Sequence, residues 1–305
     1  MTVVGPVTLR AGTHFLTGYY SPGSTPSSLL LVALHGASYD ARYFNAPGAS
    51  VHERASLAGL PILSITRPGY PATAQSARIQ PSLADTASII CDAVTSFLAE
   101  SGTPATSVVL LGHSVGGAVT MRIAATEPPW PLAGIAISGI GDVPDRAAVR
   151  RFADAPVDTV LMLPPNACRA SFYGPDGTFE PSSLNSFTSL NVPFPSRDVV
   201  EANTVWPVDF RGVAARVTVP VHLTLAEHEG LWETGPDALS RMSRAFVSSA
   251  SVETHHWLGA GHNIEHHLVG AAYCTSVFDF AHRTVQRTAH QALPSGHESW
   301  RTNQE

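Results

Sequence analysis

The sequence contains no lysine, so all 18 of its basic residues are arginines. Without a lysine ammonium the chain cannot form a Schiff base with a carbonyl substrate. Charged residues make up only 14% of the 305 residues, against about 25% in a typical soluble protein. The formal net charge is −6 and the arginines form no cluster. The composition therefore argues against a nucleic-acid partner.

Cysteine is also scarce, since Cys91, Cys168 and Cys274 stand far apart and form no C-x-x-C pattern. Such scattered cysteines predict neither a disulfide framework nor a cysteine-rich zinc site. The first residues, MTVVGP, lack the charged and apolar regions of a signal peptide. The longest apolar run is Leu29–Leu34, far short of the roughly 20 residues of a membrane span. We expect a cytoplasmic protein without a membrane span.

Short apolar runs alternate with stretches of helical periodicity along most of the chain. The runs Leu29–Leu34 and Ser107–Leu111 are typical of strands buried on both faces. We expect further strands at 3–9, 14–20, 61–65, 134–138, 219–225 and 252–258, and helical stretches at 39–59, 83–97, 116–125 and 271–281. This alternation predicts an α/β fold with a mostly parallel sheet covered by helices on both faces.

The alternation breaks between residues 142 and 212. Nine of the 24 prolines lie there, together with several aromatic residues and a Gly-Pro-Asp-Gly turn signal. A disordered linker would be poor in aromatics, so we expect this segment to fold over the domain. The predicted organisation is a core formed by residues 1–141 and 213–305, with residues 142–212 inserted as a lid rather than as an independent domain.

The sharpest motif is Gly112-His113-Ser114-Val115-Gly116-Gly117, which follows a predicted strand and opens a predicted helix. This strand–GxSxG–helix context is that of a nucleophile elbow, a turn so tight that its flanking residues must be very small. The Val115 N–H lies at the start of the helix, where the dipole and free donors favour an oxyanion. We therefore predict Ser114 as the nucleophile and Val115 as one oxyanion donor.

An acyl-transfer serine also needs a second oxyanion donor, a general base and an orienting acid. Ala37 follows a glycine after the third predicted strand, and its N–H is the candidate second donor. Glu227 and Glu229 both follow the strand that ends near residue 225, and spacing alone does not separate them as the acid. His262 lies on a glycine loop beyond the last strand, which makes it the candidate base.

Together these motifs resemble the α/β-hydrolase fold superfamily over nearly the whole chain. The resemblance is carried by Leu34-His35-Gly36, Gly112-His113-Ser114-Val115-Gly116-Gly117, Ala226-Glu227-His228-Glu229 and Gly261-His262. It implies an eight-stranded, mostly parallel sheet with a lid after the sixth strand, where residues 142–212 fall. The family's Gly-x-x-Asp pattern places Glu229 at the acid position, with Glu227 as the reserve. The turn Thr66–Tyr70 is similar to the family's turn after its fourth strand, which more often carries an acidic residue before the arginine.

A metal site is the competing interpretation of one segment. Residues 262–266, HNIEH, match H-x-x-E-H, the pattern of an inverted zinc-protease motif. Zinc would need two histidines one turn apart on an established helix, together with a third ligand. Gly259-Ala260-Gly261 instead puts His262 in a loop. We therefore expect neither a metal nor a cofactor.

Among proteins that this chain resembles, several chemistries fit poorly. Dehalogenases and epoxide hydrolases use an aspartate where Ser114 stands, and plant-type hydroxynitrile lyases use a lysine. Carbon–carbon bond hydrolases usually carry a tryptophan where Asn263 stands, and cofactor-free perhydrolases tend to carry a methionine where Val115 stands. The resemblance thus implies hydrolysis or transfer of an acyl group from an ester, lactone or thioester.

The expected substrate is a small molecule of medium size and mainly apolar character. This expectation rests on the aromatic residues of the 142–212 insertion and on Trp232, which follows the acid loop. Two other functions stay open: an acyltransferase that uses the same triad, and a ligand-binding receptor built on the hydrolase fold.

Overall fold

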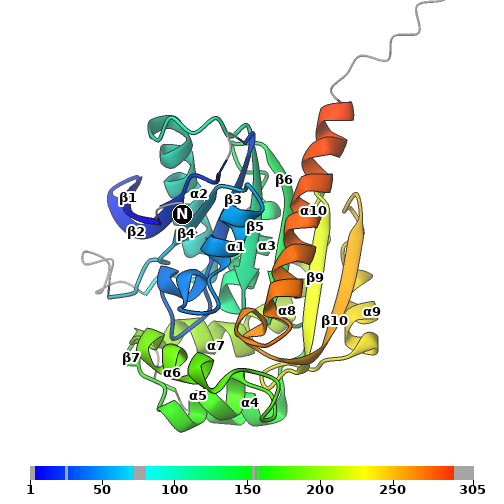
Figure 1. Cartoon of the computed structure of the whole chain (residues 1–305). Helices are drawn as coiled ribbons and strands as arrows, with labels where there is room; N and C mark the ends of the chain where they lie inside the picture. Colours follow the sequence, from blue (N-terminus) through cyan, green and yellow to red (C-terminus); the bar gives the residue numbers. More distant parts are fainter. Residues whose placement is uncertain (1–3, 25–26, 72–79, 153–154, 157, 292–305) are drawn as a thin grey trace, which may run out of the picture.

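The computed structural model describes residues 4–24, 27–71, 80–152, 155–156 and 158–291, and a large sheet forms its centre (Figure 1). Eight strands lie in the order β1-β2-β4-β3-β5-β6-β9-β10. The β1–β2 and β2–β4 pairs are antiparallel, and the other five pairs are parallel. In chain order the strands are β1 (Gly5–Ala11), β2 (His14–Ser21), β3 (Leu29–Leu34), β4 (Ile62–Ile65), β5 (Ser107–His113), β6 (Leu132–Ser138), β9 (Val221–His228) and β10 (Val252–Gly261).

Helices cover both faces of this sheet, with α1 and α10 packed together on one face and α2 and α3 on the other (Figure 1). The helices outside the 142–212 segment are α1 (Val51–Leu57), α2 (Leu83–Glu100), α3 (Val115–Ala124), α9 (Pro236–Ser243) and α10 (Gly270–Gln291), with the short 3-10 helices η1 (Ala41–Asn45) and η2 (Ile264–His266). The predicted α/β fold class is confirmed. Residues 292–305 of the predicted core lie outside the described residues.

The buried character of the central strands follows from their composition. All six residues of β3 are buried, as are all seven of β5, because helices cover both of their faces. α2 begins at a capping box in which the Ser82 and Asp85 side chains satisfy each other's backbone N–H groups. Its apolar face then packs against α3 and β1.

The connection 39–59 is helical, as the sequence indicates, but it is divided into two pieces. It consists of η1 and α1 with a break between them. Pro47 has no N–H to donate, and Gly48 has a φ of 77°, which a helix does not contain. Ser50 then starts α1 afresh, because its hydroxyl accepts the Glu53 N–H at 3.0 Å.

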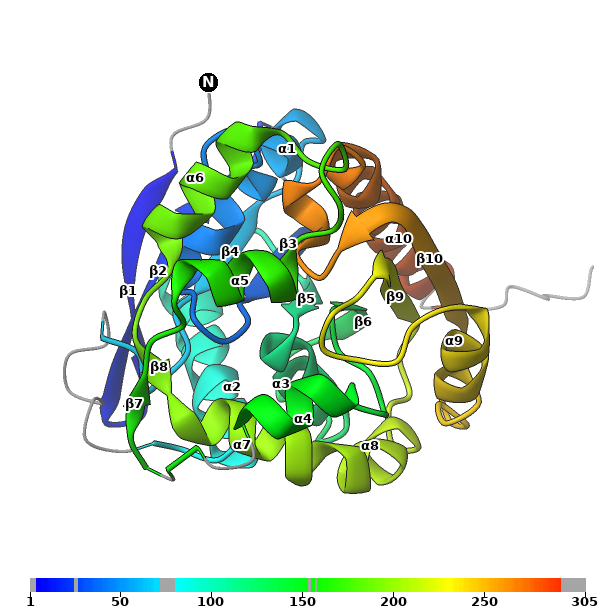
Figure 2. The same cartoon turned by 90° about the horizontal axis from the view of Figure 1, so that it is seen from below.

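The 142–212 segment contributes helices that lie across the end of the sheet where the parallel strands finish (Figure 2). Its elements are α4 (Arg146–Phe152), β7 (Val160–Leu161), α5 (Pro165–Phe172), α6 (Pro181–Leu190), β8 (Phe194–Pro195), α7 (Ser196–Thr204) and α8 (Trp206–Ala214). Trp206 is fully buried, and its indole N–H donates to the Gly141 carbonyl at 2.9 Å. α8 runs two residues past the predicted boundary at 212.

None of the helices in the described part of the chain combines the length and the apolarity that crossing a membrane requires.

Several buried histidines should make folding stability depend on pH. Burial lowers the pKa of His52 to about 4, that of His222 to about 3 and that of His266 to about 4, whereas an unfolded histidine titrates near 6.5. Between these values the unfolded chain binds more protons, so the free energy of unfolding falls as the pH decreases. The free energy of unfolding should reach its full value above about pH 7 and be lower at pH 5. Urea denaturation at the two pH values measures this difference.

The control variant is His52→Gln, which is neutral at every pH. Because His52 lies between the Ser21 and Ser64 hydroxyls at 2.9 Å from each, glutamine can keep part of this bonding. Proton uptake on unfolding at pH 5 should be smaller in this variant by about one proton. An unfolding free energy that is equal at pH 7 and pH 5 would contradict the expectation.

Candidate active site

Ser114 occupies the turn between β5 and α3 in a backbone conformation that few side-chain-bearing residues adopt. Its φ is 54° and its ψ is −127°, and a positive φ outside glycine stores strain. The flanking glycines make room for the turn, because a Cβ on Gly112 would lie 2.6 Å from the Gly116 carbonyl oxygen. A Cβ on Gly116 would overlap the Leu34 carbonyl. Local sterics therefore require this glycine spacing around Ser114.

The loop after β3 runs directly beside Ser114. A Cβ on Gly36 would lie 2.8 Å from the Ser114 Cβ and 3.3 Å from its Oγ, so only a glycine lets the backbone pass this close. Ala37 follows and lines the same cavity as Ser114 and Val115. Val115 opens α3, and the first N–H groups of a helix have no partner within it. The two predicted oxyanion donors thus lie on the two backbone segments that border Ser114.

His262 follows β10 and pairs with Glu229, which follows β9. The His262 Nδ1 lies 2.8 Å from the Glu229 Oε1 and 3.0 Å from its Oε2. Both side chains are buried, with 2% and 0% of their surfaces exposed. A carboxylate can only accept hydrogen bonds, so Nδ1 carries the proton and Nε2 keeps its lone pair. This tautomer is the one that a general base requires.

Glu227, the other glutamate near this turn, makes a different contact. It still belongs to β9, and its Oε2 accepts a hydrogen bond from the Gly259 N–H at 2.8 Å. Its side chain is 41% exposed. The structure therefore places Glu229, and not Glu227, against His262.

Aromatic rings hold His262 on two sides. Phe172 of α5 stacks on it with ring centroids 5.3 Å apart, and His113 meets it edge-on at 4.8 Å. Tyr43 stacks in turn on His113 at 4.7 Å with the planes only 7° apart. Burial, and secondarily the neighbouring His262, lowers the pKa of His113 well below its usual value. The His113 ring consequently stays neutral and adds no positive charge beside His262.

A second carboxylate, Glu265, is buried behind this stack. The Tyr43 hydroxyl donates to its Oε2 at 2.7 Å, and burial raises the pKa of Glu265 above its usual value. Glu265 and His262 therefore have separate partners rather than a common one. Within the described ranges, no three His, Cys, Asp or Glu side chains are grouped as metal ligands would be.

Two aromatic residues of the packing around His262 are given no role by the sequence motifs. Tyr43 and Phe172 belong to none of the motifs. Phe172 of α5 stacks on His262 directly, whereas Tyr43 of η1 stacks on His113, which in turn contacts His262. The only sequence feature that points to such packing is the aromatic content of the 142–212 segment. It indicates apolar packing, but it does not show which residue each ring contacts.

Ser114 and His262 line one cavity of about 40 Å³. A buried water needs roughly 10–15 Å³ of such volume, so the cavity holds only a few waters. Residues of α4, α5 and α7 form part of its wall, and Trp232 contributes as expected. The lining residues are Ala37, Tyr39, His113, Ser114, Val115, Ala148, Phe152, Leu163, Phe172, Val199, Ala202, Asn203, Leu231, Trp232 and His262.

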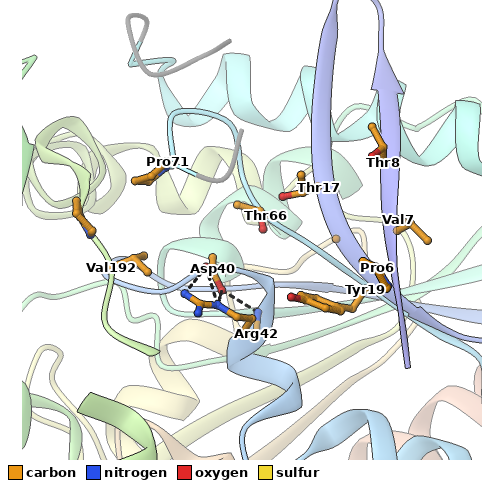
Figure 3. Close-up of a pocket in the computed structure, with 12 residues that line it drawn as sticks. Pro6, Val7, Thr8, Thr17, Tyr19, Asp40, Arg42, Thr66, Pro71 and Val192 are labelled. Carbon is orange, nitrogen blue, oxygen red and sulfur yellow. Dashed lines mark hydrogen bonds and ion pairs between the residues drawn. The ribbon is translucent and has the colours of Figure 1, made fainter. Parts of the chain in front are cut away.

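A larger and more open hollow of about 690 Å³ lies beside the β1–β2 hairpin (Figure 3). The paired side chains of Asp40 and Arg42 and the ring of Tyr19 form part of its surface. None of the candidate catalytic residues lines this hollow. The smaller cavity at Ser114 is therefore the candidate active site.

The alpha/beta hydrolase family model matches residues 31–273, so the chain belongs to the alpha/beta hydrolase family. This match confirms the resemblance that the motifs indicate. A search for similar sequences among curated proteins returned no significant match.

Solved structures share the fold at low sequence identity. The structure of E-2-(acetamidomethylene)succinate hydrolase is 16% identical, with a TM-score of 0.68 over 91% of this chain and 99% of that one. A thermophilic esterase from Thermogutta terrifontis is 16% identical, with a TM-score of 0.63 over 92% and 99%. A variant N-acyl homoserine lactonase complexed with N-hexanoyl homoserine lactone is also 16% identical, with a TM-score of 0.65 over 92% and 99%. At these identities the likeness concerns the fold alone.

The two glutamates can be separated by paired substitutions. Glu229→Gln would allow the wrong His262 tautomer, so kcat for an ester substrate should fall by roughly 10⁴. Glu227→Gln changes only contacts of a partly exposed side chain, to the Gly259 N–H at 2.8 Å and to the His228 Nε2 at 3.5 Å, and kcat should stay within about threefold. Steady-state kinetics on both variants, with circular dichroism to verify folding, would refute this assignment if Glu227→Gln caused the larger loss.

Proposed function

We propose that this protein is a serine hydrolase that cleaves an uncharged, mainly apolar ester, lactone or thioester through an acyl-enzyme on Ser114. Its membership of the alpha/beta hydrolase family supports hydrolase activity in general. The observation that carries the finer proposal is the buried hydrogen bond between His262 and Glu229, at 2.8 Å, because His262 lines the same cavity as Ser114.

The first half of the reaction forms the acyl-enzyme. The Ser114 Oγ attacks the substrate carbonyl carbon while the His262 Nε2 takes the hydroxyl proton. The Ala37 and Val115 N–H groups stabilise the negative charge that develops on the carbonyl oxygen. His262 then gives its proton to the departing alcohol or thiol, and Glu229 stabilises the imidazolium between these two transfers.

The second half releases the acyl group. A water molecule gives a proton to the His262 Nε2 and attacks the ester carbon of the acyl-enzyme. When the tetrahedral intermediate collapses, the proton returns from His262 to the Ser114 Oγ and the carboxylic acid leaves. A neutral His113 favours this cycle, because a charged ring beside His262 would oppose formation of the imidazolium.

The cavity wall supports an uncharged substrate. Its lining includes no arginine, aspartate or glutamate, and the sequence has no lysine. A substrate carboxylate in this cavity would lose its hydration without gaining a cation as partner, which is unfavourable. A volume of about 40 Å³ is also too small for a medium-sized acyl group, so side chains or helices of the 142–212 segment must move to admit it. This requirement supports the predicted role of that segment as a lid.

Ser114→Ala tests the nucleophile. Removing the hydroxyl should lower kcat by roughly four or more orders of magnitude while the fold stays intact. The matched control is Ser240→Ala, which removes an exposed hydroxyl on α9 and should leave kcat unchanged. A p-nitrophenyl ester assay and covalent labelling by a fluorophosphonate probe provide the readouts. Undiminished turnover by Ser114→Ala would end the proposal.

The acyl preference can be tested with a panel of p-nitrophenyl esters, lactones and acyl thioesters. For acyl chains of equal length, kcat/KM for the uncharged chain should exceed that for the chain ending in a carboxylate by at least tenfold, because the cavity offers no cation. Equal values would contradict the uncharged class. Product formation that follows alcohol concentration would indicate an acyltransferase, and tight ligand binding with an inert Ser114 would indicate a receptor.

A further inference from the structure

A buried ion pair joins the 142–212 segment to the sheet. Arg67 lies just beyond β4 and Asp198 in the first turn of α7, with Nη2 and Oδ2 2.6 Å apart and Nη1 and Oδ1 3.2 Å apart. The two side chains are 0% and 5% exposed. The Tyr70 hydroxyl accepts from Arg67 at 2.7 Å and donates to Asp198 at 2.6 Å. We call Arg67, Tyr70 and Asp198 the Arg67 cluster.

The Arg67 cluster also holds the loop that carries Ala37. The Arg67 Nε donates to the His35 carbonyl at 2.9 Å, and the Arg67 backbone N–H donates to the His35 Nε2 at 2.9 Å. Because Nε2 accepts, the proton of this neutral ring is on Nδ1. Nδ1 in turn donates to the Gly36 carbonyl at 2.8 Å.

The contact on the Gly36 carbonyl sets the direction of the Ala37 N–H. Both groups belong to one peptide unit, which is planar and trans, so the C=O and the N–H point to opposite sides. Glycine has unusual freedom to rotate its backbone, and without a partner for its carbonyl this peptide could turn over. Holding the oxygen of Gly36 therefore aims the N–H of Ala37.

The 142–212 segment contacts the same loop a second time. The Val192 N–H donates to the Ser38 carbonyl at 2.8 Å, and Ser38 itself has a φ of 63°. The segment thus holds this loop directly at Ser38 and through the Arg67 cluster at His35. Neither Asp198 nor Arg67 lines the cavity, so neither is placed to touch substrate.

We propose that Asp198 is a positioning residue which, through Arg67 and His35, fixes the Gly36–Ala37 peptide and so aligns the Ala37 oxyanion donor while the 142–212 segment is docked. The inference rests on the proposed function, because it assigns the Ala37 N–H to oxyanion binding. Docking of the segment would then complete the catalytic machinery as well as close the cavity.

The test compares Asp198→Asn with the wild-type enzyme on the best p-nitrophenyl ester. Loss of one oxyanion donor lowers kcat by about 10²–10³, so a misaimed donor should lower kcat by about 10- to 100-fold with KM changed less than threefold. A trifluoromethyl ketone, which forms a tetrahedral adduct with Ser114, should bind more weakly by a similar factor. Asp198→Glu, which keeps the carboxylate, should recover part of both losses.

The matched control is Asp209→Asn. Asp209 of α8 pairs with Arg122 of α3 at 2.7 Å, so this variant also breaks an ion pair between the 142–212 segment and the core. It makes no contact with the 35–38 loop, and kcat and ketone affinity should stay within about twofold. Tyr70→Phe serves as a second variant, because it removes the hydroxyl that joins Arg67 to Asp198 and that lies 3.4 Å from the Gly36 carbonyl oxygen, without leaving an unpaired buried charge. It should lower kcat and ketone affinity at least threefold.

The inference is overturned if Asp198→Asn folds and keeps the wild-type kcat and ketone affinity. It is also overturned if Asp209→Asn loses as much kcat and ketone affinity as Asp198→Asn does. If Asp198→Asn does not fold, Tyr70→Phe decides: a loss in both readouts supports the inference and wild-type values overturn it. These results leave the proposed function standing. An inert wild-type enzyme, or undiminished turnover by Ser114→Ala, would overturn the proposed function itself.

Discussion

The hydrogen-bonded pair of Glu229 and His262 is the contact on which the rest of the candidate site depends. An imidazole in a buried position could present either nitrogen to the cavity, and a buried carboxylate without a partner would be strongly unfavourable. The pairing therefore stabilises both residues. The carboxylate favours the tautomer with the proton on Nδ1, and the ring N–H provides the carboxylate with a hydrogen-bond donor. β9 and β10 are parallel neighbours, so residues just beyond their ends meet at one edge of the sheet.

Ser114 reaches this edge from β5, with β6 and β9 between β5 and β10 in the sheet. The 142–212 segment covers the strand ends and makes contacts on both sides of that separation. The Phe172 carbonyl accepts the Asn263 N–H at 3.0 Å, next to His262, while the Phe172 ring stacks on the imidazole. The same segment contacts the 35–38 loop. It therefore contacts both the loop of His262, the proposed base, and the loop of Ala37, the proposed oxyanion donor, which is more than the covering role that its composition suggests.

Local physical chemistry explains which features are predictable from the sequence. The bounds of β3 follow from its burial, and the glycine spacing around Ser114 follows from the tightness of its turn. Both features depend only on residues that are neighbours in the sequence. Glu227 and Glu229 are two positions apart, so they would face the same side of an unbroken strand. The choice between them depends on where β9 ends, between the two glutamates, and apolar periodicity does not locate that end. The partnership of Arg67 with Asp198 spans 131 positions, and no local pattern links them. The family's turn more often carries its own acid before this arginine, whereas here the acid comes from α7.

The proposed acid at position 229 is a glutamate, and its length affects the position of the turn after β9. Glutamate carries one more methylene than the family's usual aspartate, so its carboxylate extends farther from the backbone that bears it. The Leu231 N–H donates to the Glu229 Oε1 at 3.0 Å and steadies this longer arm. The backbone at position 229 is thus separated from the imidazole by the length of the glutamate side chain. The carboxylate of an aspartate at this position would not reach the ring unless the whole turn moved closer to it.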